Sequence, residues 1–425
     1  MIDPAPRTYP ISITLRARSA RGRDAAPAVQ DAASIAEWLL GDAIRIPDLL
    51  PLFEEFVWRL VAAGLPLDRA GLHVGTLHPL LVGFTWNWNI IDGLCDEIQV
   101  SEETLHLSGF RESPLAVVFE TGGALRLDLT HPSSDRYPIA ADLRAQGFTA
   151  YAALPMGGSG YYNVASMATR QPGGFTADQY GTITHLLRLL TLHVERHTAQ
   201  RIAENVATTY LGANAGAQVL HGTIRRGEGQ RINAVIWISD LRGFTDLSDR
   251  LAPEDMLLVM NAYFSTMAGT VAEFGGEVLK FIGDGVLAVF PLDRDYGGQN
   301  AATTAVAAAE AALAAQQRLN QSPPPSLARI AGWQPLRSGI GLHAGDVFFG
   351  NIGAADRLDF TVLGRAVNMA SRIEGLTKSL AHPILMTAEV AQHLSTPHHA
   401  LGFHALRGLA DPVEVFAPTA AAMPA

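Results

Sequence analysis

An aspartate follows a strongly apolar run in the C-terminal half of the sequence. Residues 234–238 read Ala-Val-Ile-Trp-Ile, and the run ends at Asp240, with Leu241 next. A near-continuous apolar run of this kind is typical of a buried central strand. A carboxylate at the point where such a strand leaves the core is in a common position for a metal ligand.

A second aspartate lies in a Gly-Asp-Gly turn. Strand-like runs at 277–282 and 286–290 flank Gly283-Asp284-Gly285, which predicts a tight hairpin with Asp284 at its tip. If the strand before Asp240 lies beside this hairpin, both carboxylates point at one spot. Two hard oxygen ligands with open positions suit Mg²⁺ or Mn²⁺. The alternative is that Asp284 is only a turn residue, since Asp-Gly is a common hairpin pair.

A third pattern combines an amide and a guanidinium. A strand-like run at 359–364 leads into an expected helix over 365–374, which carries Asn368 and Arg372. Their spacing of four places them on one helix face. Together they could orient a ribose and neutralise charge on a transferring phosphoryl group. For an isolated pair, a solvated polar stripe is the alternative.

The N-terminal half shows an order of elements typical of an α/β domain. The sequence predicts a helix over 46–63, strands over 71–77 and 80–88, a loop or short helix over 102–109, a helix over 113–121, strands over 148–155 and 161–168 joined by a turn at 157–160, and a long helix from 177 to about 206. In that last helix Ile183, Leu187, Leu190 and Val194 have coiled-coil spacing. They indicate either a short parallel dimer seam or a helix lying on its own domain.

The boundaries expected from these patterns give two domains. Residues 1–33, which contain much Pro, Ala and Ser, read as a disordered tail, and 34–195 as a first domain. A linker helix and loop is expected over 196–231, a second domain over 232–417 and a short tail over 418–425. The length of 425 residues agrees with two domains.

Composition excludes several classes of protein. A net charge of −10 gives no electrostatic reason to bind nucleic acid or an anionic membrane surface. No segment is long and apolar enough to span a bilayer, and no secretory signal is visible. The single cysteine, Cys95, is expected to be a small core hydrophobe in a reducing compartment. A cytoplasmic protein is therefore expected.

The N-terminal domain resembles a GAF-type sensor domain. The resemblance rests on residues 147–155 and on 173–176 before the last helix, and it covers about residues 40–195. It implies a small-molecule ligand, and the alternative is a domain used only for dimerisation. Trp58, Trp86 and Trp88 could line a pocket, but a core role is expected of them.

The C-terminal domain resembles the catalytic domain of class III nucleotidyl cyclases over about residues 230–417. The matching motifs occur in order at 238–245, 276–285, 339–345, 350–353, 361–372 and 406–409. The resemblance implies a ferredoxin-like, palm-type fold with a βαββαβ core, an antiparallel sheet and helices mostly on one face.

The same resemblance implies a role for each matching residue. It makes Asp240 and Asp284 the carboxylates that bind two Mg²⁺ or Mn²⁺ ions per site, assisted by the Leu241 carbonyl. Further roles are purine selection by Lys280 and Thr361, ribose orientation by Asn368, transition-state stabilisation by Arg372, and substrate contacts by Phe244, Thr245 and Arg407. Arg407 stands where the family usually has a lysine.

ATP is the substrate expected from the purine-selecting pair. Lys280 can donate a hydrogen bond to a ring nitrogen of adenine, and Thr361 can accept one from the exocyclic amine. The expected activity is therefore conversion of ATP to cyclic AMP and pyrophosphate by two-metal catalysis, under control of the N-terminal domain. The alternatives are a guanylyl cyclase, a nucleotide-binding sensor without turnover, and a cyclase that makes a cyclic dinucleotide. Because family members build each site from two subunits, a head-to-tail homodimer with composite sites is expected.

Overall fold

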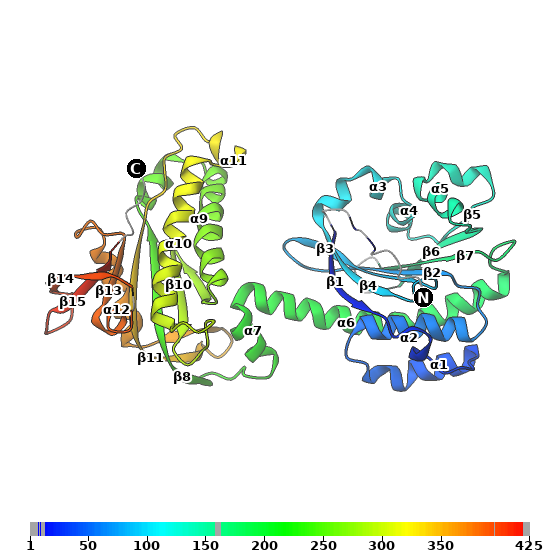
Figure 1. Cartoon of the computed structure of the whole chain (residues 1–425), viewed down its shortest axis with the longest axis horizontal. Coiled ribbons are helices and arrows are strands. Elements are labelled where there is room, and N and C mark those ends of the chain that lie inside the picture. Colours follow the sequence, from blue (N-terminus) through cyan, green and yellow to red (C-terminus); the bar gives the residue numbers. More distant parts are fainter. Residues whose placement is uncertain (1–6, 8, 10–12, 158–162, 395, 420–425) are drawn as a thin grey trace. The chain divides into compact units, whose positions relative to one another are not determined.

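The computed structural model describes residues 7, 9, 13–157, 163–394 and 396–419. The chain divides into two compact units, Met1–Val206 and Ala207–Ala425, and each is described by itself below (Figure 1). Residues 158–160 of the turn predicted at 157–160 lie outside the described residues, as do residues 420–425 of the predicted C-terminal tail. Within the described residues, no helix combines the length and apolar character needed to cross a bilayer.

The first unit is built on a seven-stranded sheet in which all neighbours are antiparallel. The strand order is β1-β4-β3-β2-β7-β6-β5. The strands are β1 Ile13–Ser19, β2 Arg69–Gly75, β3 Leu81–Asn89, β4 Cys95–Ser101, β5 Leu125–Asp128, β6 Ala150–Met156 and β7 Asn163–Thr169. The strands predicted at 71–77, 80–88, 148–155 and 161–168 are thus confirmed within a few residues.

Helices cover both faces of this sheet (Figure 1). One face carries α1 Ala32–Leu40, α2 Leu49–Ala62 and α6 Ala177–Leu211, and the other carries η3 Glu102–His106, α3 Ser108–Arg111, α4 Pro114–Thr121 and α5 Pro138–Ala145. Shorter turns are η1 Gly22–Ala25, η2 Asp42–Arg45 and η4 Pro132–Arg136. The core role predicted for Trp58, Trp86, Trp88 and Cys95 is confirmed, since all four are buried in the core of the first unit.

The α6 helix packs on its own unit over the stretch with coiled-coil spacing. Ile183, Leu187, Leu190 and Val194 are all buried in the core of the first unit. An apolar stripe that is already buried has no free surface for a dimer seam. Of the two interpretations of this stripe, the structure therefore supports the helix that lies on its own domain.

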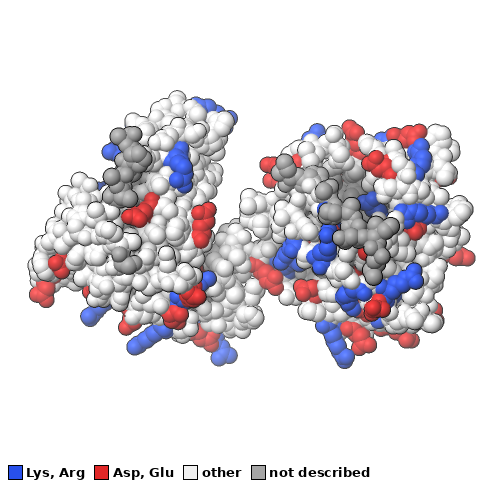
Figure 2. Space-filling view, viewed as in Figure 1, with Lys and Arg blue, Asp and Glu red and all other residues white. Residues whose placement is uncertain are grey.

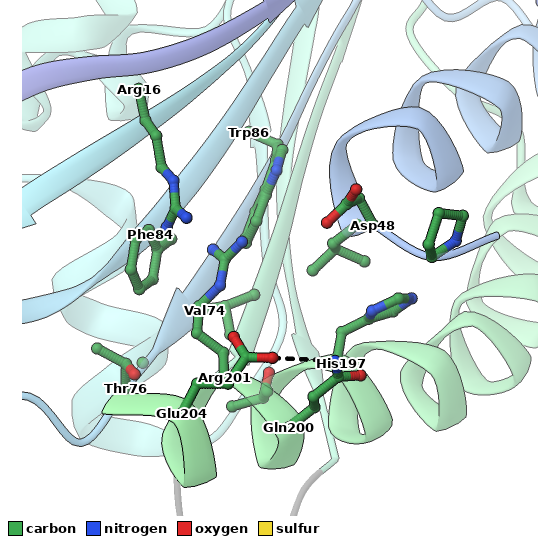
Figure 3. A pocket seen from close by; sticks show the side chains of 14 residues that line it. Arg16, Asp48, Val74, Thr76, Phe84, Trp86, His197, Gln200, Arg201 and Glu204 are labelled. Atoms are coloured by element: carbon green, nitrogen blue, oxygen red, sulfur yellow. Dashed lines mark hydrogen bonds between the residues drawn. The ribbon is translucent and has the colours of Figure 1, made fainter. Parts of the chain in front are cut away.

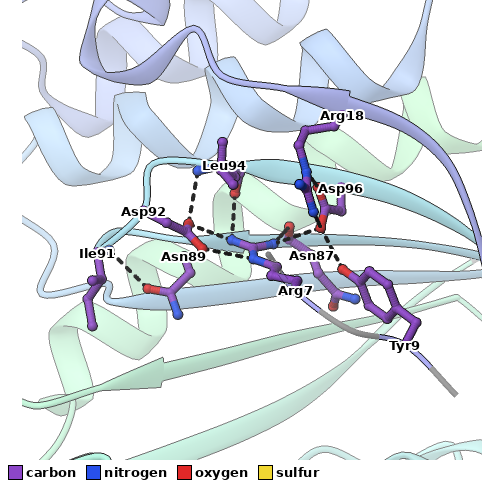
Figure 4. A network of polar contacts seen from close by, with 9 residues as sticks. All are labelled: Arg7, Tyr9, Arg18, Asn87, Asn89, Ile91, Asp92, Leu94 and Asp96. Atoms are coloured by element: carbon purple, nitrogen blue, oxygen red, sulfur yellow. Dashed lines mark hydrogen bonds and ion pairs between the residues drawn. The ribbon is translucent and has the colours of Figure 1, made fainter. Parts of the chain in front are cut away.

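The prediction of a disordered tail over 1–33 is wrong for most of its length. Residues 13–19 form β1, which pairs with β4, and η1 follows. Two arginines of this segment, Arg7 and Arg18, neutralise a buried carboxylate (Figure 4). Arg18 Nε lies 2.6 Å from Oδ1 of the fully buried Asp96, and the Tyr9 hydroxyl donates to Asp96 at 2.6 Å. Arg7 bridges Asp92 and Asp96, so the segment is held by ion pairs that composition does not reveal.

Burial and pairing act in opposite directions on Asp96. Burial raises the pKa of the carboxyl, but the hydrogen bonds from Arg18 and Tyr9 and the charge of Arg7 outweigh it and hold the pKa below its usual value. The carboxylate is therefore charged and paired at neutral pH.

The second unit contains an eight-stranded sheet of order β14-β15-β13-β11-β8-β10-β9, with β12 paired to β11. Only the β11–β13 pair is parallel. The strands are β8 Gly229–Leu241, β9 Glu277–Ile282, β10 Gly285–Pro291, β11 Ser338–Gly353, β12 Leu358–Leu363, β13 Ile384–Thr387, β14 His398–His404 and β15 Val413–Pro418. The predicted central strand, hairpin and antiparallel sheet are confirmed.

Helices lie on both faces of this sheet, which corrects the expectation that they lie mostly on one. Val235 and Trp237 of β8 face α9 Pro253–Glu273 and α10 Ala301–Gln321. Ala234 and Ile236 face α7 Ala213–Leu220 and α12 Arg365–Leu376. Both sets are buried because the central strand is apolar on both sides. The remaining helices are α8 Phe244–Arg250, α11 Pro325–Ala328 and α13 Ala388–Ala391.

The stretch expected to link the domains, 196–231, contains the end of α6, all of α7 and the first residues of β8. His197 and Thr198 are buried in the first unit. The assignment of a sensor role to one unit and a catalytic role to the other stays a prediction at this point.

Figure 2 shows acidic and basic side chains intermingled over both units on the face that it presents. The described residues of that face form no continuous basic band, in agreement with the net charge of −10.

Candidate active site

Strand register brings Asp240 and Asp284 to the same end of the second sheet. Asp240, near the end of β8, is paired with Gly285, the first residue of β10, so Asp284 of the hairpin stands beside it. A side chain at Gly285 would place its Cβ 2.9 Å from the Ser239 carbonyl oxygen, so only glycine permits this close pairing. The sequence-based expectation that the two carboxylates meet is thus confirmed.

The electrostatics of the pair are those of two acids competing for ionisation. Burial, and then the negative charge of Asp240, raise the pKa of Asp284, and Lys378 opposes this shift. Two close carboxylates that repel one another are stabilised by a cation between them.

The donor set fits a hard divalent cation. Two carboxylates with open coordination positions suit Mg²⁺ or Mn²⁺, which complete their shells with phosphate and water oxygens. Among the described residues, no group of three or more His, Cys, Asp or Glu side chains could hold a metal ion, so a zinc site has no ligands there.

Lys280, on β9, forms an ion pair with Asp359, on β12. Both residues line a groove of about 1310 Å³ along β9 and β12. Thr361 lies two residues after Asp359 on the same strand, so the two side chains share one face of it. Lys280 and Thr361 are therefore on two strands that contact each other, although β9 pairs with β10 and β12 with β11 in the sheet. Asp359 is not among the site residues predicted from the sequence, although its position two residues before Thr361 indicates that it shares a strand face with it.

The α12 helix presents Asn368 and Arg372 away from the sheet. Asn368 is exposed and Arg372 is half-buried, whereas Ala370 and Ile373 are fully buried. A Cβ at Gly408 would lie 3.5 Å from an Arg372 Nη atom, so the guanidinium lies beside the loop that carries the exposed Arg407. Within the described residues, neither arginine is paired with a carboxylate, which leaves both free for an anionic ligand.

Glycines of β11 allow α12 to pack directly on the sheet. A Cβ at Gly341 would lie 2.3 Å from the Glu374 backbone nitrogen and 2.5 Å from the Ala370 carbonyl oxygen. These contacts are with helix backbone, so no side chain can fit. The absence of a side chain at Gly341 therefore determines how closely the helix that carries Asn368 and Arg372 packs on the sheet.

An ion pair joins the segment after Asp240 to the same helix. An Arg242 Nη atom lies 3.1 Å from a Glu374 Oε atom, and both side chains are mostly buried. Burial raises the pKa of Glu374 to about 7, although the charge of Arg242 lowers it. This pair is not among the predictions from the sequence, because nothing in the spacing of Arg242 and Glu374 indicates that they are in contact.

Phe244 and Thr245, the remaining predicted substrate contacts, begin α8. Gly243 has a φ of 73°, which turns the chain from Leu241 into the helix. Phe244 is half-buried and Thr245 is exposed. Leu241 itself is buried.

The predicted site residues fall into two groups. Asp240 and Asp284 form one group by contact, whereas Lys280, Thr361, Asn368, Arg372 and Arg407 form a second group only by the roles that the resemblance implies. Within the part of the chain that the structure describes, no hydrogen bond or ion pair joins a member of one group to a member of the other.

Comparison with known proteins assigns this unit to a family. Residues 229–411 match the family model for the adenylate and guanylate cyclase catalytic domain. They form a cyclase catalytic domain of this family. The class III resemblance noted in the sequence is thus confirmed for this part of the chain, whereas the GAF-like resemblance of the first unit stays a prediction.

Individual relatives match the cyclase domain at modest identity. An adenylate cyclase of Anabaena cylindrica is 38% identical over 164 residues, which are 38% of this chain and 31% of that protein. Adenylate cyclase 1 of Rhizobium meliloti is 31% identical over 154 residues, 36% of this chain and 22% of the relative. The chain thus spans less than a third of the length of either curated relative.

Solved structures also match the cyclase domain. A bacterial light-regulated adenylyl cyclase is 29% identical with a TM-score of 0.38, covering 45% of this chain and 91% of the other. The guanylyl cyclase Cya2 is 34% identical with a TM-score of 0.39, covering 44% and 92%.

Proposed function

We propose that this protein is an adenylyl cyclase that converts ATP to 3′,5′-cyclic AMP and pyrophosphate. The observation that carries the proposal is the meeting of Asp240 and Asp284 at the end of β8, within a domain that matches the cyclase family. A domain that had lost turnover would have no need to hold two repelling carboxylates together.

Each group of residues has a definite task in this reaction. Divalent ions bound by Asp240 and Asp284, with help from the Leu241 carbonyl, would supply charge stabilisation and activation of the ribose 3′-oxygen. Asn368 orients the ribose, and the free guanidinium of Arg372 stabilises negative charge that develops around the α-phosphate. Arg407, beside Arg372, contacts the triphosphate. Phe244 and Thr245 complete the substrate contacts.

Lys280 and Thr361 favour adenine over guanine. Lys280 donates to a ring nitrogen, and Thr361 accepts from the exocyclic amine. Guanine presents a carbonyl and a ring N–H at these positions, so it would leave polar groups unpaired. Asp359 supports this choice by holding the Lys280 ammonium on the strand that carries Thr361. Adenylate cyclases among the named relatives favour the same substrate.

A homodimer with composite sites accounts for the separation of the two groups. Large apolar side chains remain exposed next to Lys280, namely Phe281, Ile282 and Leu363, which are 50%, 58% and 63% exposed. Their strands, β9 and β12, lie close together. Exposed apolar residues grouped in this way are typical of a protein interface. A second copy that packs there brings its carboxylate pair to the Lys280, Asn368 and Arg372 of the first.

The first unit is proposed to regulate the cyclase domain as a sensor. Its antiparallel sheet with helices on both faces supports this role, together with the GAF-like resemblance of its sequence.

The direct test is identification of the product. The purified full chain is incubated with Mn²⁺ or Mg²⁺ and either ATP or GTP, and the products are separated by chromatography. We expect cyclic AMP from ATP, and its loss in Asp284→Ala but not in Asp249→Asn, a change at an exposed aspartate of α8. Cyclic GMP from GTP alone would show that the assignment of Lys280 and Thr361 is wrong. The absence of any product from a folded dimer with both metals would contradict the proposal.

A further inference from the structure

The first unit contains a cavity of about 650 Å³ on the sheet face that α6 does not cover. Its floor is formed by β1 to β4, and its cover by η3, α3 and α4. The covering side chains are apolar: Leu105, Phe110, Leu115 and Phe119. The volume lies within the roughly 300–1,000 Å³ typical of small-molecule sites.

Glycines of β2 and β3 leave part of the cavity floor without side chains. Gly75 and Gly83 both line the cavity. A Cβ at Gly83 would lie 2.3 Å from the Val74 carbonyl oxygen, so a larger residue would not fit there without moving the strands.

Arg69 supplies an uncompensated positive charge at this cavity. It lies on β2 and is mostly buried, and no carboxylate among the described residues pairs with it. Burial lowers the pKa of Arg69, and no nearby carboxylate opposes that effect. A desolvated guanidinium without a counter-charge is costly unless a ligand provides one.

Arginines elsewhere in the same unit show the usual arrangement. A smaller hollow of about 100 Å³ on the other sheet face is lined by Arg16 and Arg201 (Figure 3). Arg201 lies 3.0 Å from Glu97 and stacks over Phe84 at 4.4 Å. Arg16 is 3.5 Å from the same Glu97. Both arginines lie near a carboxylate, and Asp48 and Glu204 also line this hollow, so its charges are balanced without an anion. Arg69 stands out by contrast.

Other polar groups at the larger cavity are neutral. His73 contacts Thr85 Oγ1 at 3.1 Å and Ser166 Oγ at 3.0 Å, and burial lowers the pKa of His73 to about 3. The Oγ1 atoms of Thr76 and Thr104 are buried and have no partner among the described residues. The cavity thus offers one cation, two hydroxyls without a partner among the described residues, the neutral side chains of His73, Thr85 and Asn87, and an otherwise apolar lining.

We propose that this cavity binds a small organic monoanion whose carboxylate pairs with Arg69 and whose apolar body lies against Leu105, Phe110 and Phe119. One guanidinium without a second cation matches a single charge better than a doubly charged phosphate. The apolar cover requires that the rest of the ligand be hydrocarbon. This inference concerns binding to the first unit and does not rest on the proposed cyclase activity.

Octanoate and 1-octanol, which share an apolar chain and differ in charge, are the probes that test it. Binding of each to the full chain is measured by isothermal titration calorimetry. We expect octanoate to bind at least about tenfold more tightly than 1-octanol, because a carboxylate forms a charge-assisted hydrogen bond with the guanidinium that a neutral hydroxyl does not. In Arg69→Gln this preference is lost, whereas in Arg188→Gln, a change at an exposed arginine of α6, it is retained.

A second variant tests the proposal even if Arg69→Gln does not fold. Leu105→Trp fills the cavity from its cover and is expected to weaken both probes at least about tenfold, with an unchanged thermal transition. Equal affinity for the two probes, retention of the octanoate preference in Arg69→Gln, or no binding of either probe would each overturn the proposal.

Discussion

At the scale of single residues, the proposed chemistry depends on two kinds of charged group: like charges that the fold holds close together, and charges that have no partner among the described residues. Asp240 and Asp284 are held together against their repulsion, and Arg372 has no carboxylate partner among the described residues. Lys280 is the exception, since Asp359 pairs with it. The pair is partly exposed, at 26% and 60% of the two side chains, so its energy is modest.

Asp359→Asn tests whether this pair positions Lys280 for the base. An exposed or half-exposed ion pair contributes about 0.2–1 kcal/mol, so we expect the preference for ATP over GTP in kcat/KM to fall by roughly two- to fivefold. Asp356→Asn, which changes an exposed aspartate just before β12, is the matched control and should keep the wild-type ratio. The same ratio in both variants would show that Asp359 does not act on Lys280.

At the scale of elements, close backbone packing decides where the site residues stand. The α12 helix lies against β11 because Gly341 has no side chain, and Gly285 allows the β8–β10 pairing that brings the two aspartates together. Both glycines lie inside strands, where glycine otherwise weakens the structure. Both positions require glycine because backbone atoms of a neighbouring strand or helix lie where a Cβ would be.

Gly341→Ala should therefore raise α12 from the sheet. Because the new Cβ would meet helix backbone at 2.3 Å, we expect a loss of about 1–3 kcal/mol in stability and a larger loss of turnover. Gly269→Ala is the control, since no atom lies within 4 Å of its Cβ position in α9 and alanine favours a helix. Urea denaturation and the nucleotide assay measure the two effects. A Gly341→Ala protein as stable and as active as Gly269→Ala would refute this explanation of the packing.

Sequence patterns were sufficient for elements whose identity depends on local signals. The hairpin at Asp284, the helix after Gly364 and the buried strand before Asp240 were all predicted, since turn chemistry and periodicity are local. Contacts between residues distant in the sequence were not predicted. Arg18 pairs with Asp96, and its segment, expected to be a tail, forms β1. The Arg242–Glu374 and Lys280–Asp359 ion pairs depend on how distant segments pack and on strand register, which one sequence does not reveal.

At the scale of the whole molecule, the first unit has a pH-dependent stability that arises from buried histidines. Burial keeps His73 neutral, with a pKa of about 3 in the fold against about 6.5 in the unfolded chain, and burial lowers the pKa of His197 to about 4. As the pH falls below 6.5, the unfolded state binds protons that the folded state does not. The contribution of these two histidines to the stability of the first unit is therefore fully present above pH 6.5 and is lost as the pH falls toward 3.

His73→Gln isolates the contribution of one histidine. For each such group the slope is up to about 1.4 kcal/mol per pH unit. We expect the urea midpoint of the wild type, followed by tryptophan fluorescence, to fall between pH 6.5 and 5, and the fall to be smaller in His73→Gln. Identical pH dependence in the two proteins would show that His73 is not kept neutral by the fold.

The central claim at this scale is that one active site takes its two groups of residues from two copies of the chain. The most direct measurement mixes two inactive variants, Asp240→Ala and Arg372→Ala, and assays cyclic AMP formation from ATP. Each mixed dimer contains one site with both defects and one with neither, so we expect the mixture to regain up to about a quarter of wild-type activity for random pairing, while each variant alone stays inactive. If mixed dimers are demonstrated and the mixture remains inactive, the two groups do not come from different copies and the account is contradicted.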